Sequence, residues 1–221
     1  MKFILMLILY VGTTSSLIAQ SKIGIELKTS YRITGNASAL HSMSTMYTLN
    51  NVIEQKNTIS EAYEIGFFYN HTKRMKFKFL IGSTYKGLLL TAEIYNDLPG
   101  FRAMRTFQDK THFIQFTPLM SYDLIYGKIK IPIEVGITFN SIYKDFYNQY
   151  HDNKLVFSRK YHMDLRLSTG FHYYDFEMIE IGINIIYAQS FTNYLTNKFS
   201  YDGDFIPYQL GAELAIQYTI N

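Results

Sequence analysis

The sequence predicts an all-β protein that folds as an eight-stranded antiparallel up-and-down transmembrane β-barrel. Three observations lead to this prediction. Segments in which apolar and polar residues alternate recur from residue 22 to the end, the connections between them alternate in length, and their polar positions carry nearly equal numbers of acids and bases. A period of two places successive side chains on opposite faces of a strand, so each segment has one apolar and one polar face.

The first expected strand, residues 22–33, follows the alternation without a slip. Its odd positions are apolar or aromatic apart from Thr29, and its even positions are polar, charged or glycine. In the third segment the pattern blurs, because Ser83 and Gly87 fall on the apolar parity. The same alternation predicts the remaining strands at 59–70, 75–90, 112–125, 129–140, 161–173, 178–187 and 206–221.

The segment 112–125 departs from the pattern more than the others. Phe113 and Leu119 fall on its polar face, and Pro118 removes one donor from the hydrogen-bond ladder. We therefore expect a bulge or a local widening of the sheet near Pro118. The next segment, 129–140, alternates without interruption.

The connections between these strands alternate in length. The chain has three short ones, at 71–74, 126–128 and 174–176, and four long ones, at 34–58, 91–110, 143–158 and 188–204. Eight antiparallel strands joined in this way have both chain ends and all short turns at one end of the barrel. Bacterial outer-membrane barrels have this asymmetry, with short periplasmic turns and long extracellular loops.

The two faces of the strands differ in chemistry. On the polar parity lie seven acids and seven bases: Glu26, Glu64, Asp123, Glu134, Asp164, Glu180, Glu213, Lys28, Arg32, Lys76, Lys78, Lys86, Lys130 and Arg166. Tyrosines gather near strand ends, where an amphipathic ring suits a membrane interface: Tyr31, Tyr69, Tyr126, Tyr143, Tyr161, Tyr173, Tyr187, Tyr208 and Tyr218. We therefore expect lipid around the apolar face. The alternative is a soluble lipocalin-like lipid binder with that face inward.

A barrel of eight strands has an interior just wide enough for side chains to fill. Acids and bases confined there are expected to pair, because an unpaired buried charge is costly. A selective pore would instead show a ring dominated by one sign of charge. The sequence thus predicts a packed polar interior that does not conduct.

The N-terminus has the layout of a secretory signal peptide. Lys2 precedes an apolar run at 3–11, small polar residues follow, and Ala19 stands before Gln20. The apolar run is too short to anchor the chain in a membrane. We expect residues 1–19 to be the signal peptide of an exported protein and residues 20–221 to form one outer-membrane β-barrel domain.

Composition excludes several classes of function. The formal net charge of +3 gives no electrostatic footprint for nucleic acid. With Cys 0, the chain has no disulfide framework, no thiolate metal site and no lipidated cysteine. The histidines are scattered and do not have the spacing typical of metal ligands, so we predict no metal site. No pattern in the sequence indicates a cofactor.

The whole mature chain resembles the small eight-stranded outer-membrane β-barrel family, of the OmpA and OmpX transmembrane type, and particularly the PorT-like outer-membrane β-barrel proteins. The resemblance is carried by "SLIAQ" at the end of the signal, the strand–turn rhythm over 21–221, the hairpin "QFTPLMSYDLIYGKIKIPIEVGITFN" and a final strand that reaches the last residue. The chain departs from many such barrels because it ends in Asn221 and not in an aromatic residue.

Histidines beside carboxylates or hydroxyls are the candidates for catalysis. His162 and Asp164 share the polar face of one strand with His172, and a histidine–carboxylate pair can serve as a general base. No serine stands at a recognisable spacing from them, so we expect them to join the polar interior.

The long connections hold further candidates. Segment 39–45 contains His41 near Ser42 and Ser44. Segment 149–154 contains His151 and Asp152, and Arg102 and Arg105 in "FRAMR" form a small basic loop that is able to touch anionic lipopolysaccharide. Polar loops carry such residues without catalysing anything, so we predict no catalytic, cofactor-binding or metal-binding residues.

The predicted function is that of a non-enzymatic integral outer-membrane barrel with long extracellular loops. It would serve envelope structure, surface interaction, or an outer-membrane secretion or transport assembly as a subunit. The expected partners are outer-membrane lipids, lipopolysaccharide and a protein bound through the loops, without nucleic acid. A lipid-modifying outer-membrane enzyme, acting by acyl transfer or deacylation, is the alternative.

Overall fold

The structure is a computed structural model that describes residues 22–36, 40–44, 49–95, 102–146, 161–176, 178–192, 201–203 and 206–220. No helix in these ranges is long and apolar enough to cross a membrane. Their strands are β1 (Ile23–Asn36), β2 (Leu40–Ser44), β3 (Leu49–Lys56), β4 (Thr58–Asn70), β5 (Met75–Tyr95), β6 (Arg102–Tyr126), β7 (Ile129–Phe146), β8 (Tyr161–Phe176), β9 (Ile179–Ser190), β10 (Tyr201–Gly203) and β11 (Pro207–Ile220).

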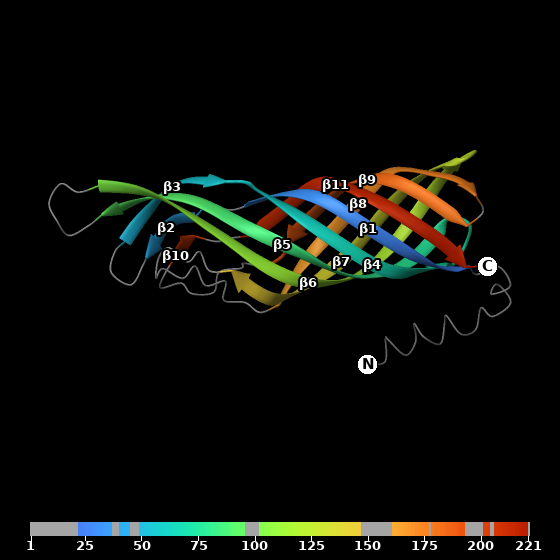
Figure 1. Cartoon of the computed structure of the whole chain (residues 1–221), viewed down its shortest axis with the longest axis horizontal. Helices are drawn as coiled ribbons and strands as arrows, with labels where there is room; N and C mark the ends of the chain where they lie inside the picture. The colour runs from blue at the N-terminus through green and yellow to red at the C-terminus, as the bar shows by residue number, and fades with distance from the viewer. Residues whose placement is uncertain are drawn as a thin grey trace.

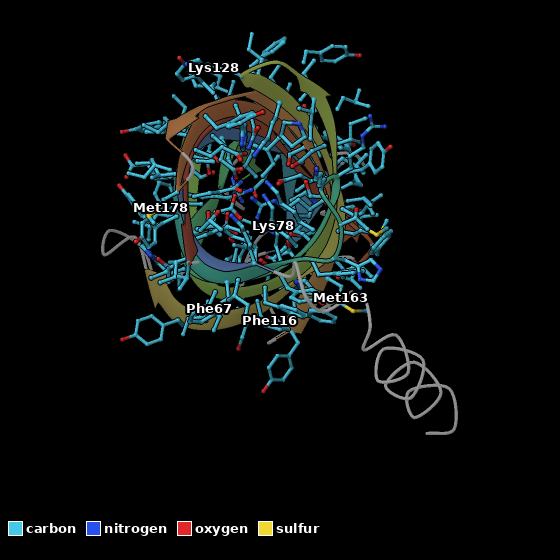
Figure 2. All side chains as sticks on the ribbon, turned by 90° about the vertical axis from the view of Figure 1, so that its right-hand side faces the viewer. Phe67, Lys78, Phe116, Lys128, Met163 and Met178 are labelled. Atoms are coloured by element: carbon cyan, nitrogen blue, oxygen red, sulfur yellow. The ribbon has the colours of Figure 1, made fainter. Side chains whose placement is uncertain are left out.

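Eight of these strands close into a barrel, as the sequence predicts. Around the ring the order is β5, β4, β1, β11, β9, β8, β7 and β6, and β6 pairs with β5 to complete the circle. Every pairing is antiparallel, and the first strand, β1, pairs with the last, β11. Viewed from one end, the strands form a closed ring around a crowded interior (Figure 2).

The start of β1, the end of β11 and the short turns lie together at one end of the barrel. The Asn70 N–H donates to the carbonyl of Lys22 at 3.0 Å, and the Thr219 N–H donates to that of Met178 at 2.7 Å. Gly127 has a φ of 59°, a conformation that glycine adopts without steric cost and that reverses the chain between β6 and β7. The predicted orientation of the strands is therefore confirmed.

At the opposite end, all four of the expected long connections contain strand residues, and in 143–158 these are residues 143–146 at the end of β7. Segment 34–58 holds β2 and β3, segment 188–204 holds β10, and in 91–110 the hairpin of β5 and β6 continues until Tyr95 pairs with Arg102. The prediction of loops was wrong there. Outside a bilayer no lipid demands an apolar face, so the alternation fades while backbone hydrogen bonding continues.

These extra strands build a sheet that projects beyond the barrel (Figure 1). β3 pairs with the outer part of β5, from Asn50 opposite Ile94 to Lys56 opposite Leu89. β2 pairs with β3, and β10 pairs with β2. On the side of the long connections, β3, β2 and β10 therefore extend the sheet of β5 and β6, and we call these three strands the platform.

The irregularity expected near Pro118 is found in two places. The register of β6 against β7 shifts between His112 and Phe113, which is where the bulge lies. At Thr117 and Pro118 the ladder with β7 is interrupted while the register stays the same, and the Thr117 hydroxyl donates to the Thr138 hydroxyl at 3.1 Å across the gap. The missing donor of Pro118 thus opens the ladder locally without adding a residue.

The apolar faces of the barrel strands point outward. Ile183 and Phe171 are 63% and 69% exposed, whereas Lys78 is completely buried. Figure 2 shows Lys78 inside the ring, and Phe67 and Phe116 outside it. A lipocalin-like binder needs the reverse arrangement, so the structure contradicts that alternative.

Candidate functional site: the polar interior of the barrel

The interior holds all fourteen charged side chains expected there, and every one of the eight barrel strands contributes at least one of them. Seven are acids and seven are bases, so their formal charges cancel. Lys130, the most accessible, has 18% of its side chain exposed. Every second residue of the eight strands points toward the axis of a narrow barrel, and this brings the charged side chains together.

A lysine–glutamate cluster occupies the middle of the barrel. Lys28 Nζ lies 2.9 Å from both Glu134 Oε2 and Glu213 Oε1. Lys78 Nζ lies 2.9 Å from Glu26 Oε1 and also pairs with Glu134. Each lysine therefore bridges two carboxylates that come from different strands, which ties opposite walls of the barrel to one another.

Two arginines continue this cluster toward the long connections. Arg166 uses both terminal nitrogens, Nη1 to Glu64 Oε1 and Nη2 to Glu213 Oε2, each at 2.5 Å. Arg32 Nη2 lies 3.3 Å from Glu64 Oε2, and its Nε donates to the Ser30 hydroxyl at 2.8 Å. A planar guanidinium suits this role because its donors reach two acceptors in fixed directions.

A second cluster lies toward the short turns and is centred on Glu180. Its carboxylate is 2.5 Å from Lys130 Nζ, 3.5 Å from Lys76 Nζ and 2.7 Å from His172 Nδ1. The His172 ring fits because residue 182 is glycine: a Cβ there would lie 1.9 Å from the ring. The glycine thus makes room for the histidine in the cluster.

Amide side chains join the clusters into one network. Gln217 accepts a hydrogen bond from Lys76 Nζ at 3.0 Å and donates to Glu26 Oε1 at 2.9 Å. Asn184 Nδ2 donates to Glu213 Oε1 at 3.2 Å, and its Oδ1 lies 2.9 Å from His172 Nε2. Ion pairs and hydrogen bonds therefore run from the short turns to the arginines without a break.

A third group of side chains lies nearer the projecting platform. Asp164 Oδ2 pairs with Lys86 Nζ at 2.5 Å and accepts from Asn140 Nδ2 at 2.9 Å. Gln115 Nε2 donates to Asn140 Oδ1 at 2.7 Å. The Lys86 ammonium also lies 5.5 Å from the ring centroid of Phe113, within cation–π range.

Apolar side chains fill much of the space that the charges leave. Phe113 and Leu119, which the sequence places on the polar face, do point inward and are 1% and 4% exposed. Phe68, Leu80 and Ile186 are inward as well. Sequence reasoning overlooked these three, although an apolar residue on the polar parity was the available signal.

The structure separates the histidines that were candidates for catalysis. The His162 ring packs against Phe113, at 5.7 Å between centroids, while Asp164 makes its contacts with Lys86 and Asn140. His172 belongs to the Glu180 cluster, nearer the short turns. Asp164 is thus the partner of a lysine, whereas the carboxylate that contacts a histidine is Glu180.

The candidates in the long connections are placed as follows. His41, Ser42 and Ser44 belong to β2, not to a loop, and His151 and Asp152 lie outside the described residues. Arg102 and Arg105 belong to β6, also not to a loop. In the ranges that the structure describes, no group of three or more His, Asp or Glu side chains is placed to hold a metal ion.

The architecture is similar to that of known bacterial barrels. Neisserial surface protein A (NspA) matches with a TM-score of 0.54 and 8% identity, over 90% of this chain and 97% of that one. The fold is that of a small outer-membrane β-barrel.

Two Pseudomonas aeruginosa structures also match. OprG has a TM-score of 0.49 and 11% identity, over 90% of this chain and 96% of that one. The N-terminal barrel domain of OprF has a TM-score of 0.43 and 10% identity, over 91% and 100%. No protein-family model and no curated protein matches the sequence.

Proposed function

We propose that the protein is a non-enzymatic barrel of the outer membrane that holds a platform of strands and loops at the cell surface and does not conduct ions. The observation that carries this proposal is the balanced, hydrogen-bonded interior. Lys28, Lys78 and Arg166 each bind two carboxylates across the lumen, at the depth where a pore would need to be open.

The outer surface supports residence in a membrane. Apolar side chains cover the barrel on all sides, and a soluble monomer rarely exposes a contiguous apolar patch larger than a few hundred Å². Closed antiparallel barrels are also the only sheets that satisfy all backbone groups in lipid. Extraction tests this part: the protein should stay with membranes after an alkaline wash and migrate faster on unboiled gels. Recovery in the soluble fraction would contradict it.

The platform supports a role at the surface. β2, β3 and β10 extend the wall of β5 and β6 on the side of the long connections, where a partner outside the membrane has access. Three roles fit: envelope structure, surface interaction, and service as a subunit of an outer-membrane secretion or transport assembly. Membership of the PorT-like group would favour the third role. Capture of partners from mild detergent, compared between the intact barrel and a variant lacking 40–56, tests this role. Equal recovery by both would contradict it.

The proposal assigns no catalysis to the barrel. Its support is that Asp164, two residues from His162 in sequence, and Glu180, which contacts His172, are both bound by lysines. Replacement of His41, His151 and His162 by alanine should leave lipid A composition unchanged in cells. An altered composition would favour the lipid-modifying enzyme instead.

A further inference from the structure

A groove of about 560 Å³ crosses the outer surface of the barrel over β11, β1, β4 and β5. These four strands are neighbours in the ring and lie side by side in Figure 1. The outward-facing residues that line the groove are Leu27, Thr29, Tyr63, Ile65, Ile81, Ser83, Leu214 and Ile216. None of these eight is charged, and Lys28, Glu64 and Gly82 complete the lining from inward-facing positions.

Short side chains create the groove. Thr29 and Ser83 are short residues at outward positions, most of which carry large apolar side chains elsewhere on the barrel, and both pair with Tyr63, one from each side. The Tyr63 hydroxyl donates to Glu61 Oε2 at 3.0 Å. Glu61 lies two residues nearer the platform on the same strand, so this bond directs the Tyr63 ring along β4 toward the platform. The space over Thr29 and Ser83, on either side of Tyr63, is therefore left open.

An apolar shelf bounds the groove on the side of the short turns. Leu27, Ile65 and Ile81 are consecutive partners across β1, β4 and β5, and they are 50%, 55% and 57% exposed. Polar groups begin on the opposite side, where Glu61 lies opposite Tyr31 in the next row. The lining of the groove is therefore mainly apolar, its outward polar atoms being the hydroxyls of Thr29, Tyr63 and Ser83, and a charged group, Glu61, stands on its platform side.

These features select the occupant. A groove without outward charge does not suit a phosphate or sugar headgroup, which needs donors or cations. Eleven residues line it, whereas each side of a stable protein–protein interface contributes about 20–30 residues. A single flexible alkyl chain matches the apolar lining and the limited size.

We propose that this groove binds one acyl chain of a bilayer lipid more tightly than the rest of the barrel surface does. The inference rests on the proposed residence in a membrane. Dispersion contacts with the shelf supply the affinity: the acyl chain is already in hydrocarbon, so its methylene groups gain packing contacts in a fitted groove and no transfer from water is involved.

Photolabelling tests the site. The full chain is placed in nanodiscs of phosphatidylethanolamine and phosphatidylglycerol that contain a trace of phospholipid with a diazirine on one acyl chain. We expect adducts to concentrate on peptides carrying Leu27, Ile65 and Ile81. Ser83→Phe fills the groove and should lower labelling of these peptides by about tenfold, equivalent to about 1.4 kcal/mol of binding free energy.

Ser141→Phe is the matched control, because Ser141 is a short outward residue of β7 outside the groove. It should leave the labelling unchanged. Thr29→Leu fills the groove from the other side and replaces Ser83→Phe if that variant loses the gel shift of a folded barrel.

Even labelling around the barrel, unchanged by either filling variant, would overturn the site. Cross-links between two copies at the groove would also overturn it, and would identify a second chain as the occupant. A folded barrel that acquires no label on any strand would contradict the membrane residence itself, and the inference would fall with it.

Discussion

Replacement of Arg166 by methionine should destabilise the barrel strongly, because it removes the cation that joins two buried carboxylates. Arg166 contacts Glu64 and Glu213 at 2.5 Å each. Removing one partner of a buried ion pair costs about 3–5 kcal/mol, since the remaining charge is left uncompensated. Each carboxylate keeps one further cation, Arg32 or Lys28, so we expect a loss at the lower end, about 3 kcal/mol.

The assay is urea unfolding in lipid vesicles, followed by circular dichroism and by the mobility of the folded barrel on unboiled gels. The chain has Trp 0, so tryptophan fluorescence is not an option without an added reporter. Leu167→Met, on the outward face next to Arg166, is the matched control and should cost less than about 1.5 kcal/mol.

A double-mutant cycle identifies the cause. Glu213→Gln removes one of the two carboxylates, so adding it to Arg166→Met should cost less than the sum of the single changes, by about 0.5–3 kcal/mol. A loss for Arg166→Met no larger than that of Leu167→Met, or strictly additive effects, would refute the reasoning that the interior charges are paired and buried.

Three further changes probe other parts of the barrel. Gly182→Ala should cost about 1–3 kcal/mol because its methyl group overlaps the His172 ring, and His172→Ala in the same chain should relieve most of that loss. Ile183→Lys should cost about 2–4 kcal/mol as a charge toward the middle of the lipid-facing surface, and Ile179→Lys, at the start of β9, about 0–1 kcal/mol; equal costs would contradict the assigned depth. Gly127→Ala should cost about 1–2 kcal/mol from its positive φ alone, since nothing lies within 4 Å of the added Cβ, and an unchanged urea midpoint would contradict this.

Periodicity of two was sufficient to predict the eight barrel strands and the faces of their residues. The reason is physical: lipid on one side and a narrow polar lumen on the other impose opposite requirements on neighbouring residues. Beyond the membrane these opposite requirements no longer apply, and the alternation in the sequence ends there. The outer parts of β5 and β6, from 91 to 95 and from 102 to 110, remain paired strands although their sequence reads as a loop.

The sequence predicts which charged residues point into the interior, but it does not predict which of them pair with one another. Parity alone places Lys28 and Glu134 on the polar face. Their contact joins strands 106 residues apart in sequence and depends on the register of every strand between them. Amides such as Gln217 and Asn184, which link the clusters, carry no charge pattern that would have singled them out. His162, Asp164 and His172 lie in the interior as expected, but their spacing in sequence did not reveal that Lys86 is the partner of Asp164.

The central claim is that the lumen is closed by paired charges, and conductance of single barrels in planar bilayers tests it most directly. Folded wild-type protein, with insertion verified by the gel shift, should give no steady current steps at a range of voltages in 1 M KCl. Brief openings should appear when Lys78→Met breaks the central cluster, because that side chain bridges Glu26 and Glu134 across the lumen. Large, steady steps from the wild-type barrel would contradict the account.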